Sequence, residues 1–158
     1  MSDIDAILQK MQTILAKKRA EYFDPERPTN LLTEVIPANL EAVAKQWELP
    51  KDYLYFLSKY SPVGVEWDND NYFALDICEA KDLINIQAGY SYNALTNEIN
   101  DDWPHGYLVI AVSNGDPYCI DLGMTNSPIL TAMHGVGKWD FYKDSDSFKD
   151  FLKKIVVE

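Results

Sequence analysis

Apolar residues recur with helical spacing at the start of the chain. The stripe consists of Ile4, Ile7, Leu8, Met11, Ile14 and Leu15. Residues three and four positions apart lie on one side of a helix, so the pattern predicts an amphipathic helix over residues 2–20. Acidic Asp3 and Asp5 suit its N-terminal end, and Lys17 suits its C-terminal end. We expect this stripe to pack on protein, either within the same domain or on a second copy.

Two further helices are predicted to begin at prolines, which suit the first helical position. A helix from Pro37 would bury Leu40, Val43, Ala44 and Trp47. A helix from Pro50 would bury Tyr53, Phe56, Leu57 and Tyr60. Residues 24–30 contain two prolines and predict a loop, and residues 61–64 are expected to end the third helix.

From residue 72 onward the pattern indicates strands. We expect strands at 72–75, 107–112, 118–122, 129–133 and 139–142, a short helix at 79–89 and a polar loop at 91–102. The dipeptide at 114–115, Asn-Gly, predicts a tight hairpin. Asp146 would cap a last helix that buries Phe148, Phe151, Leu152 and Ile155. This order predicts an α+β fold, with a single mixed or antiparallel sheet flanked by N-terminal helices and a C-terminal helix.

Length and composition favour one globular domain. The chain has 158 residues, and domains usually run to about 100–150 residues. No apolar run approaches the length of about 18 residues that a membrane-spanning helix needs. The N-terminus is acidic and does not resemble a secretory signal, and Cys78 and Cys119 form neither a metal motif nor a disulfide framework. These features predict a soluble, cytoplasmic protein with free thiols.

Charge is distributed unevenly along the chain. The formal net charge is −11, and residues 61–136 contain 11 acidic side chains and one basic side chain, Lys81. Such a chain repels phosphate, so we expect it to bind neither nucleic acid nor an anionic membrane. Two interpretations remain open. The carboxylates keep the protein soluble, or they form a negative surface for a basic partner.

Metal chemistry finds little support in the sequence. Residues 68–79 place oxygen-bearing side chains at several positions of a calcium-binding loop. Phe73, however, stands where that loop needs glycine for its sharp turn. His105 and His134 have no metal-ligand spacing. We therefore expect no metal and no cofactor.

Catalytic signatures are equally weak. Neither histidine lies beside a nucleophile motif, and no phosphate-binding glycine loop is present. Asp116 and Asp121 are an odd number of residues apart, so a strand would place them on opposite faces rather than across a cleft. We expect the protein not to be an enzyme. The alternative, a hydrolase, would require a deep cleft with an acidic group of raised pKa.

Aromatic residues are interspersed among the carboxylates between positions 66 and 103. Tryptophan and tyrosine often anchor protein interfaces, although a single such ring is more often structural. We predict that carboxylates attract the partner and rings anchor it. The predicted partner-binding residues are Glu66, Trp67, Asp68, Asp70, Tyr72, Tyr90, Tyr92, Glu98, Asp101 and Asp102.

Four segments in order resemble the SUKH superfamily, which includes a cell-wall assembly regulator and bacterial toxin-immunity proteins. They are LPKDYLYFL at 49–57, DICEAKDL at 76–83, GDPYCIDL at 115–122 and DSFKDFL at 146–152. The resemblance covers residues 36–156 of a single domain, 1–158, and leaves residues 1–32 outside. The chain departs from the family at 61–64, where Ser-Pro-Val-Gly replaces a common Asn-Gly-Gly.

The resemblance implies an α+β fold and no catalytic residues. It also implies one of two binding functions. The first is an immunity protein that neutralises a toxin, such as a nuclease, by direct binding, and the acidic middle of the chain suits a basic toxin surface. The second is a regulatory scaffold for endogenous proteins. We expect a monomer or a weak homodimer.

Overall fold

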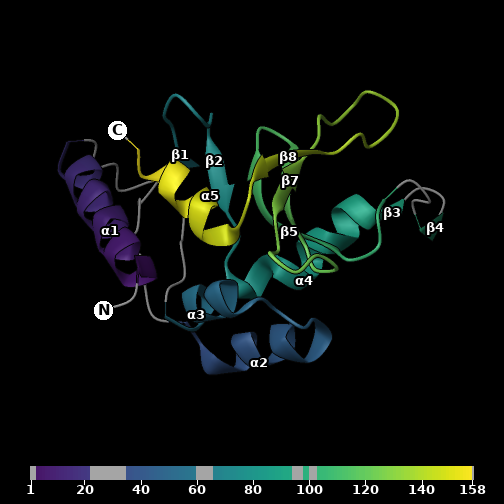
Figure 1. Ribbon diagram of the computed structural model, residues 1–158, viewed down its shortest axis with the longest axis horizontal. Helices are drawn as coiled ribbons and strands as arrows, with labels where there is room; N and C mark the ends of the chain where they lie inside the picture. The colour runs from purple at the N-terminus through teal and green to yellow at the C-terminus, as the bar shows by residue number, and fades with distance from the viewer. Residues whose placement is uncertain (1–2, 22–34, 60–65, 94–97, 100–102, 158) are drawn as a thin grey trace.

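The computed structural model describes residues 3–21, 35–59, 66–93, 98–99 and 103–157 (Figure 1). The helices are α1 (Asp3–Glu21), α2 (Pro37–Gln46), α3 (Lys51–Lys59), α4 (Ala80–Ser91) and α5 (Phe148–Ile155). The strands are β1 (Glu66–Trp67), β2 (Leu75–Ile77), β3 (Tyr92–Asn93), β4 (Glu98–Ile99), β5 (Tyr107–Ser113), β6 (Asp116–Asp121), β7 (Ile129–Thr131) and β8 (Tyr142–Ser145). The predicted α+β fold is confirmed.

Six strands form one antiparallel sheet in the order β1-β2-β5-β6-β7-β8. The predicted hairpin at residues 114–115 joins β5 to β6. Asn114 and Gly115 both have positive φ angles, of 48° and 92°. Two positive φ angles are what a type I′ turn requires, which explains why the Asn-Gly pair occurs here.

Residues of α1, α3 and α5 form the main core together with Leu108, Ile120 and Ile129 on the first face of the sheet. The ring centroids of Tyr53 on α3 and Phe148 on α5 lie 4.9 Å apart in an edge-to-face contact. Figure 1 shows α1 beside α5 at one end of the molecule. The apolar stripe of α1 is buried in this core, so it packs within its own domain.

The second face of the sheet carries the residues that alternate with those of the first. Val109 on β5 and Cys119 on β6 are buried there. Helix α4 reaches this face and is fixed by Gln87. The Gln87 side chain donates to the Val109 carbonyl and accepts from the Val109 amide, both at 2.8 Å. It therefore hydrogen-bonds to β5 as a neighbouring strand would.

Several predicted boundaries were wrong. The last strand is β8 at 142–145 rather than 139–142. Trp139 and Phe141 pack in a ring cluster and are not part of a β-strand. The α5 N-cap is Ser147, one residue after Asp146, and its Oγ accepts from the Asp150 amide. Ala44 is exposed, because α2 buries only a narrow side around Val43.

The strand expected from residue 72 begins only at Leu75, because residues 72–74 still belong to the turn before β2. Other differences involve short strands. The polar segment predicted as a loop at 91–102 contains β3 and β4, which pair as a two-residue ribbon. Strand β1 was not predicted, since two residues are too few to show alternation. The predicted loop at 24–30, the turn at 61–64 and Tyr60 lie outside the described residues. No helix among the described residues is long and apolar enough to cross a membrane.

Candidate protein-binding surface

Four carboxylates gather where the sheet edge meets the start of α4. Glu66 on β1 and Asp76 on β2 are paired residues in adjacent antiparallel strands, so their side chains lie on the same face. Glu79 immediately precedes α4, and Asp82 lies in its first turn. We name these four residues, Glu66, Asp76, Glu79 and Asp82, the acidic edge.

The acidic edge is electrostatically unfavourable for the folded chain. Partial desolvation raises the pKa of Asp76, and the negative charges of Glu66, Asp82 and Glu79 raise it further. Like charges directly opposite each other in a sheet are destabilising. Lys81 offsets part of this repulsion, because its Nζ lies 3.3 Å from a Glu79 carboxylate oxygen. The arrangement can attract positive charge that a partner supplies.

Two polar side chains in the turn between β1 and β2 make hydrogen bonds that hold the fold. An Asp68 carboxylate oxygen accepts from the Ala74 amide at 2.8 Å. Asn69 Nδ2 donates to the carbonyls of Lys154 and Ile155, each at 2.9 Å, and so binds the C-terminal end of α5. Asp70 stays exposed. Among the described residues, no three His, Cys, Asp or Glu side chains are arranged to hold a metal ion.

Two of the predicted anchoring rings lie in the core. Trp67 is 2% exposed, because strand alternation turns it inward where Glu66 points outward. Tyr72 is 4% exposed; its hydroxyl donates to Asp144 at 2.8 Å, and its ring contacts Phe151. The prediction that Trp67 and Tyr72 are surface contacts was therefore wrong.

The other predicted residues divide into three groups. Glu66, Asp68, Asp70 and Glu98 are exposed. Tyr90 is half-buried in a ring cluster. Asp101, Asp102 and the side chain of Tyr92 lie outside the described residues.

Sequence reasoning missed three members of the acidic edge, Asp76, Glu79 and Asp82, as binding residues. A signal for the first was available in Leu75-Asp76-Ile77, because an acidic residue between two apolar strand residues points to solvent. The position of Glu79 and Asp82 beside Asp76 depends on the direction in which the chain turns between the end of β2 and the start of α4. That geometry is tertiary and leaves no local pattern.

A cluster of five rings lies on the second face of the sheet. We name it the aromatic face: Tyr90, Trp103, Tyr107, Trp139 and Phe141. Neighbouring centroids are close, with Trp103–Trp139 at 5.3 Å and Tyr107–Phe141 at 4.9 Å. The rings come from three separate segments, so only the fold brings them together.

Both cysteines are buried and free. Burial raises the pKa of Cys78 to about 12, and the nearby charges of Asp76 and Asp82 add to the shift. Burial likewise raises the pKa of Cys119. Because the thiolate is the nucleophilic form, neither side chain is prepared for nucleophilic chemistry at neutral pH.

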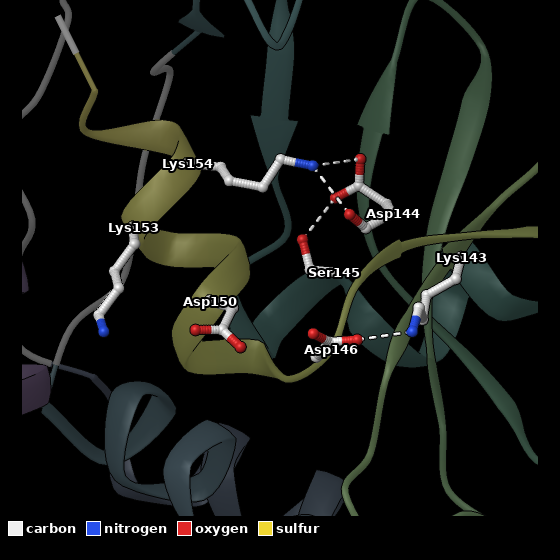
Figure 2. Close-up of a pocket in the computed structure, with 7 residues that line it drawn as sticks. All are labelled: Lys143, Asp144, Ser145, Asp146, Asp150, Lys153 and Lys154. Atoms are coloured by element: carbon white, nitrogen blue, oxygen red, sulfur yellow. Dashed lines mark hydrogen bonds and ion pairs between the residues drawn. The ribbon is translucent and has the colours of Figure 1, made fainter.

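An open groove lies between β8 and α5 (Figure 2). Four of its charged residues form two ion pairs. Lys154 Nζ lies 3.1 Å from a carboxylate oxygen of Asp144 and donates to the Asp144 carbonyl at 2.8 Å. Lys143 Nζ lies 2.6 Å from Asp146, and this partner lowers the pKa of Asp146. The Lys154–Asp144 contact therefore joins α5 to β8, and the groove has two internal ion pairs along its lining.

Comparison with known families agrees with this architecture. The chain matches the SMI1/KNR4 family (SUKH-1) over residues 35–154, a region that extends from just before α2 into α5 and omits α1. A comparison with curated proteins finds no match. The family match covers most of the chain, including the whole sheet. The protein therefore belongs to the SMI1/KNR4 family (SUKH-1).

Proposed function

We propose that this protein is a non-enzymatic binding protein that neutralises a toxin by direct contact, as immunity proteins do. The acidic edge would bind a basic surface of the toxin. One observation carries the proposal: Glu66 and Asp76 are held side by side although their charges repel. A lysine or arginine of the partner would offset that repulsion on binding. The complex would thereby gain a favourable electrostatic interaction that the free protein lacks.

The wider charge distribution supports the same partner. Residues 61–136 contain 11 acidic side chains and only one basic one. A negative surface of this kind can raise association rates with a basic protein toward about 10⁸–10⁹ M⁻¹s⁻¹ at low salt. Nucleases are basic where they hold phosphates, so a nuclease domain is the toxin class that this surface suits best.

Co-expression tests the proposal. The toxin domain encoded by the gene beside this one would be produced in a sensitive host, with and without this protein. We expect survival only when the protein is present, and a complex that is retained on an affinity column and weakens as salt rises. A host that dies equally in both cases would contradict the immunity function. A growth defect on gene loss without any toxin would instead favour the regulatory scaffold.

A further inference from the structure

The aromatic face is a continuous set of rings that the core does not fully enclose. Trp103 is 9% exposed, and Tyr90, Tyr107, Trp139 and Phe141 are each half-buried. Tyr90 and Trp139 have centroids 5.7 Å apart, and Trp103 and Phe141 have centroids 5.5 Å apart. The cluster therefore offers several partly exposed rings close together, rather than one isolated side chain.

Carboxylates border these rings. Asp121 is the cross-strand partner of Tyr107, and its charge, after burial, raises the pKa of the Tyr107 hydroxyl. Asp140 is exposed between Trp139 and Phe141 in the chain. Each ring face is itself the negative side of a quadrupole. Rings and carboxylates together thus favour a cation at this surface.

Positive charge from the same segment is limited. Lys138 is exposed beside the rings in the chain, and Lys143 is paired with Asp146 at 2.6 Å. His134 lies near the β5–β6 hairpin, where its Nδ1 is 2.6 Å from Asp116. Two of these three basic residues, Lys143 and His134, are therefore engaged with carboxylates of the protein itself.

Among cations, guanidinium matches this chemistry best. Arginine stacks on aromatic faces, hydrogen-bonds to carboxylates in two-pronged fashion and is less strongly hydrated than lysine. We propose that the aromatic face binds arginine side chains of a basic protein partner, through stacking on Trp139 and Phe141 and pairing with Asp121. This proposal rests on the proposed function, because it assigns a second contact to the same basic partner.

Selectivity between two peptides of equal charge provides the test. Acetylated tetra-arginine and tetra-lysine peptides would be titrated into the labelled full chain at physiological salt, and the indole and backbone resonances followed by NMR. We expect the arginine peptide to bind about threefold or more tightly than the lysine peptide and to shift the Trp139 indole signal. The acidic edge should contribute to the affinity for both peptides alike.

Two variants separate stacking from net charge. Trp139→Leu keeps an apolar side chain, and we expect it to bring the arginine-to-lysine ratio to about one. Trp47→Leu removes another half-buried tryptophan, one that packs against the first-face core, and should leave the ratio unchanged. Phe141→Leu provides a second change if Trp139→Leu lowers the unfolding midpoint.

The outcomes are distinct from those of the co-expression test. Equal affinity of the wild-type protein for both peptides would overturn the arginine assignment and leave the proposed immunity function standing. An arginine-to-lysine affinity ratio that stays at the wild-type value in folded Trp139→Leu and Phe141→Leu would also overturn the arginine assignment alone. Conversely, arginine selectivity that depends on Trp139, in a protein that fails to protect against the toxin, would support the aromatic face and contradict the immunity function.

Discussion

Asp76 is a residue of the acidic edge whose charge lowers the stability of the folded protein. Its neighbours Leu75 and Ile77 are buried, whereas its own carboxylate faces Glu66 across the strand pair. Because the pKa of Asp76 is raised, the folded protein binds a proton at this carboxyl more tightly than the unfolded chain does. In the unfolded chain the carboxyl has a pKa of about 4. The stability of the protein should therefore fall as pH rises through the raised pKa.

Asp76→Asn should stabilise the protein at neutral pH. We expect its free energy of unfolding at pH 7 to rise by about 0.5 kcal/mol, because an opposed like-charge pair is removed. Below about pH 4 the gain should vanish, since the carboxyl is then protonated in both states. Urea unfolding at several pH values measures this difference in the free energy of unfolding between variant and wild type. Asp70→Asn, an exposed turn residue, is the control, and an equal gain in both variants would contradict the repulsion.

Gln87 is a residue whose role depends entirely on tertiary structure. Gln87→Leu would leave the Val109 amide and carbonyl without their side-chain partner, and we expect a loss of about 2–3 kcal/mol in the free energy of unfolding. Asn85→Leu alters an exposed residue of the same helix and should change stability little. Similar losses in the two variants, measured by urea unfolding, would show that Gln87 does not bind β5 in this way.

At the scale of elements, long periodic segments were predictable and short ones were not. The α1 stripe and the buried run of β5 contain enough residues to reveal their period, and the Asn-Gly pair identified the β5–β6 hairpin. β1, β3 and β4 have two residues each, too few for a pattern. The segment 139–142 has the alternating aromatic residues of a strand. In the folded chain, however, Trp139 and Phe141 pack in a ring cluster, which the sequence alone does not reveal.

Helix α1 lies outside the family match yet contributes to the core, so its contacts should matter for stability. Leu8 is fully buried, and Leu8→Ala should lower the free energy of unfolding by about 2–4 kcal/mol. Gln9→Ala changes an exposed neighbour on the same helix and should have little effect. If Leu8→Ala were as stable as Gln9→Ala in thermal and urea unfolding, the stripe would not pack as described.

For the whole molecule, charge predicted the general region of the candidate surface and one member of the acidic edge, Glu66, but not the other three. Strand alternation places Trp67 in the core and Glu66 on the surface, whereas Tyr72 is buried in the turn between β1 and β2. Asp76, Glu79 and Asp82 joined it because the sheet edge and the start of α4 meet. The aromatic face was likewise hidden in the sequence, since its rings are separated by up to about fifty positions along the chain.

The two surfaces suggest how one basic partner could be held. The acidic edge lies at the start of α4, and Tyr90 near the end of the same helix belongs to the aromatic face. Long-range attraction by the carboxylates would speed the encounter, whereas short-range stacking on rings would slow release. Affinity should thus depend on salt through the first surface and on side-chain identity through the second.

The most direct test of this account is the affinity of the cognate toxin domain for a variant without the acidic edge. Calorimetry at physiological salt would compare wild type with Glu66→Gln/Asp76→Asn/Asp82→Asn, folded as judged by circular dichroism. Glu41→Gln/Glu48→Gln/Asp52→Asn removes the same charge from exposed positions in the α2–α3 region. We predict binding about 100-fold weaker for the first variant and within about threefold of wild type for the second. Equal affinities in the two variants would contradict a docking role for the acidic edge.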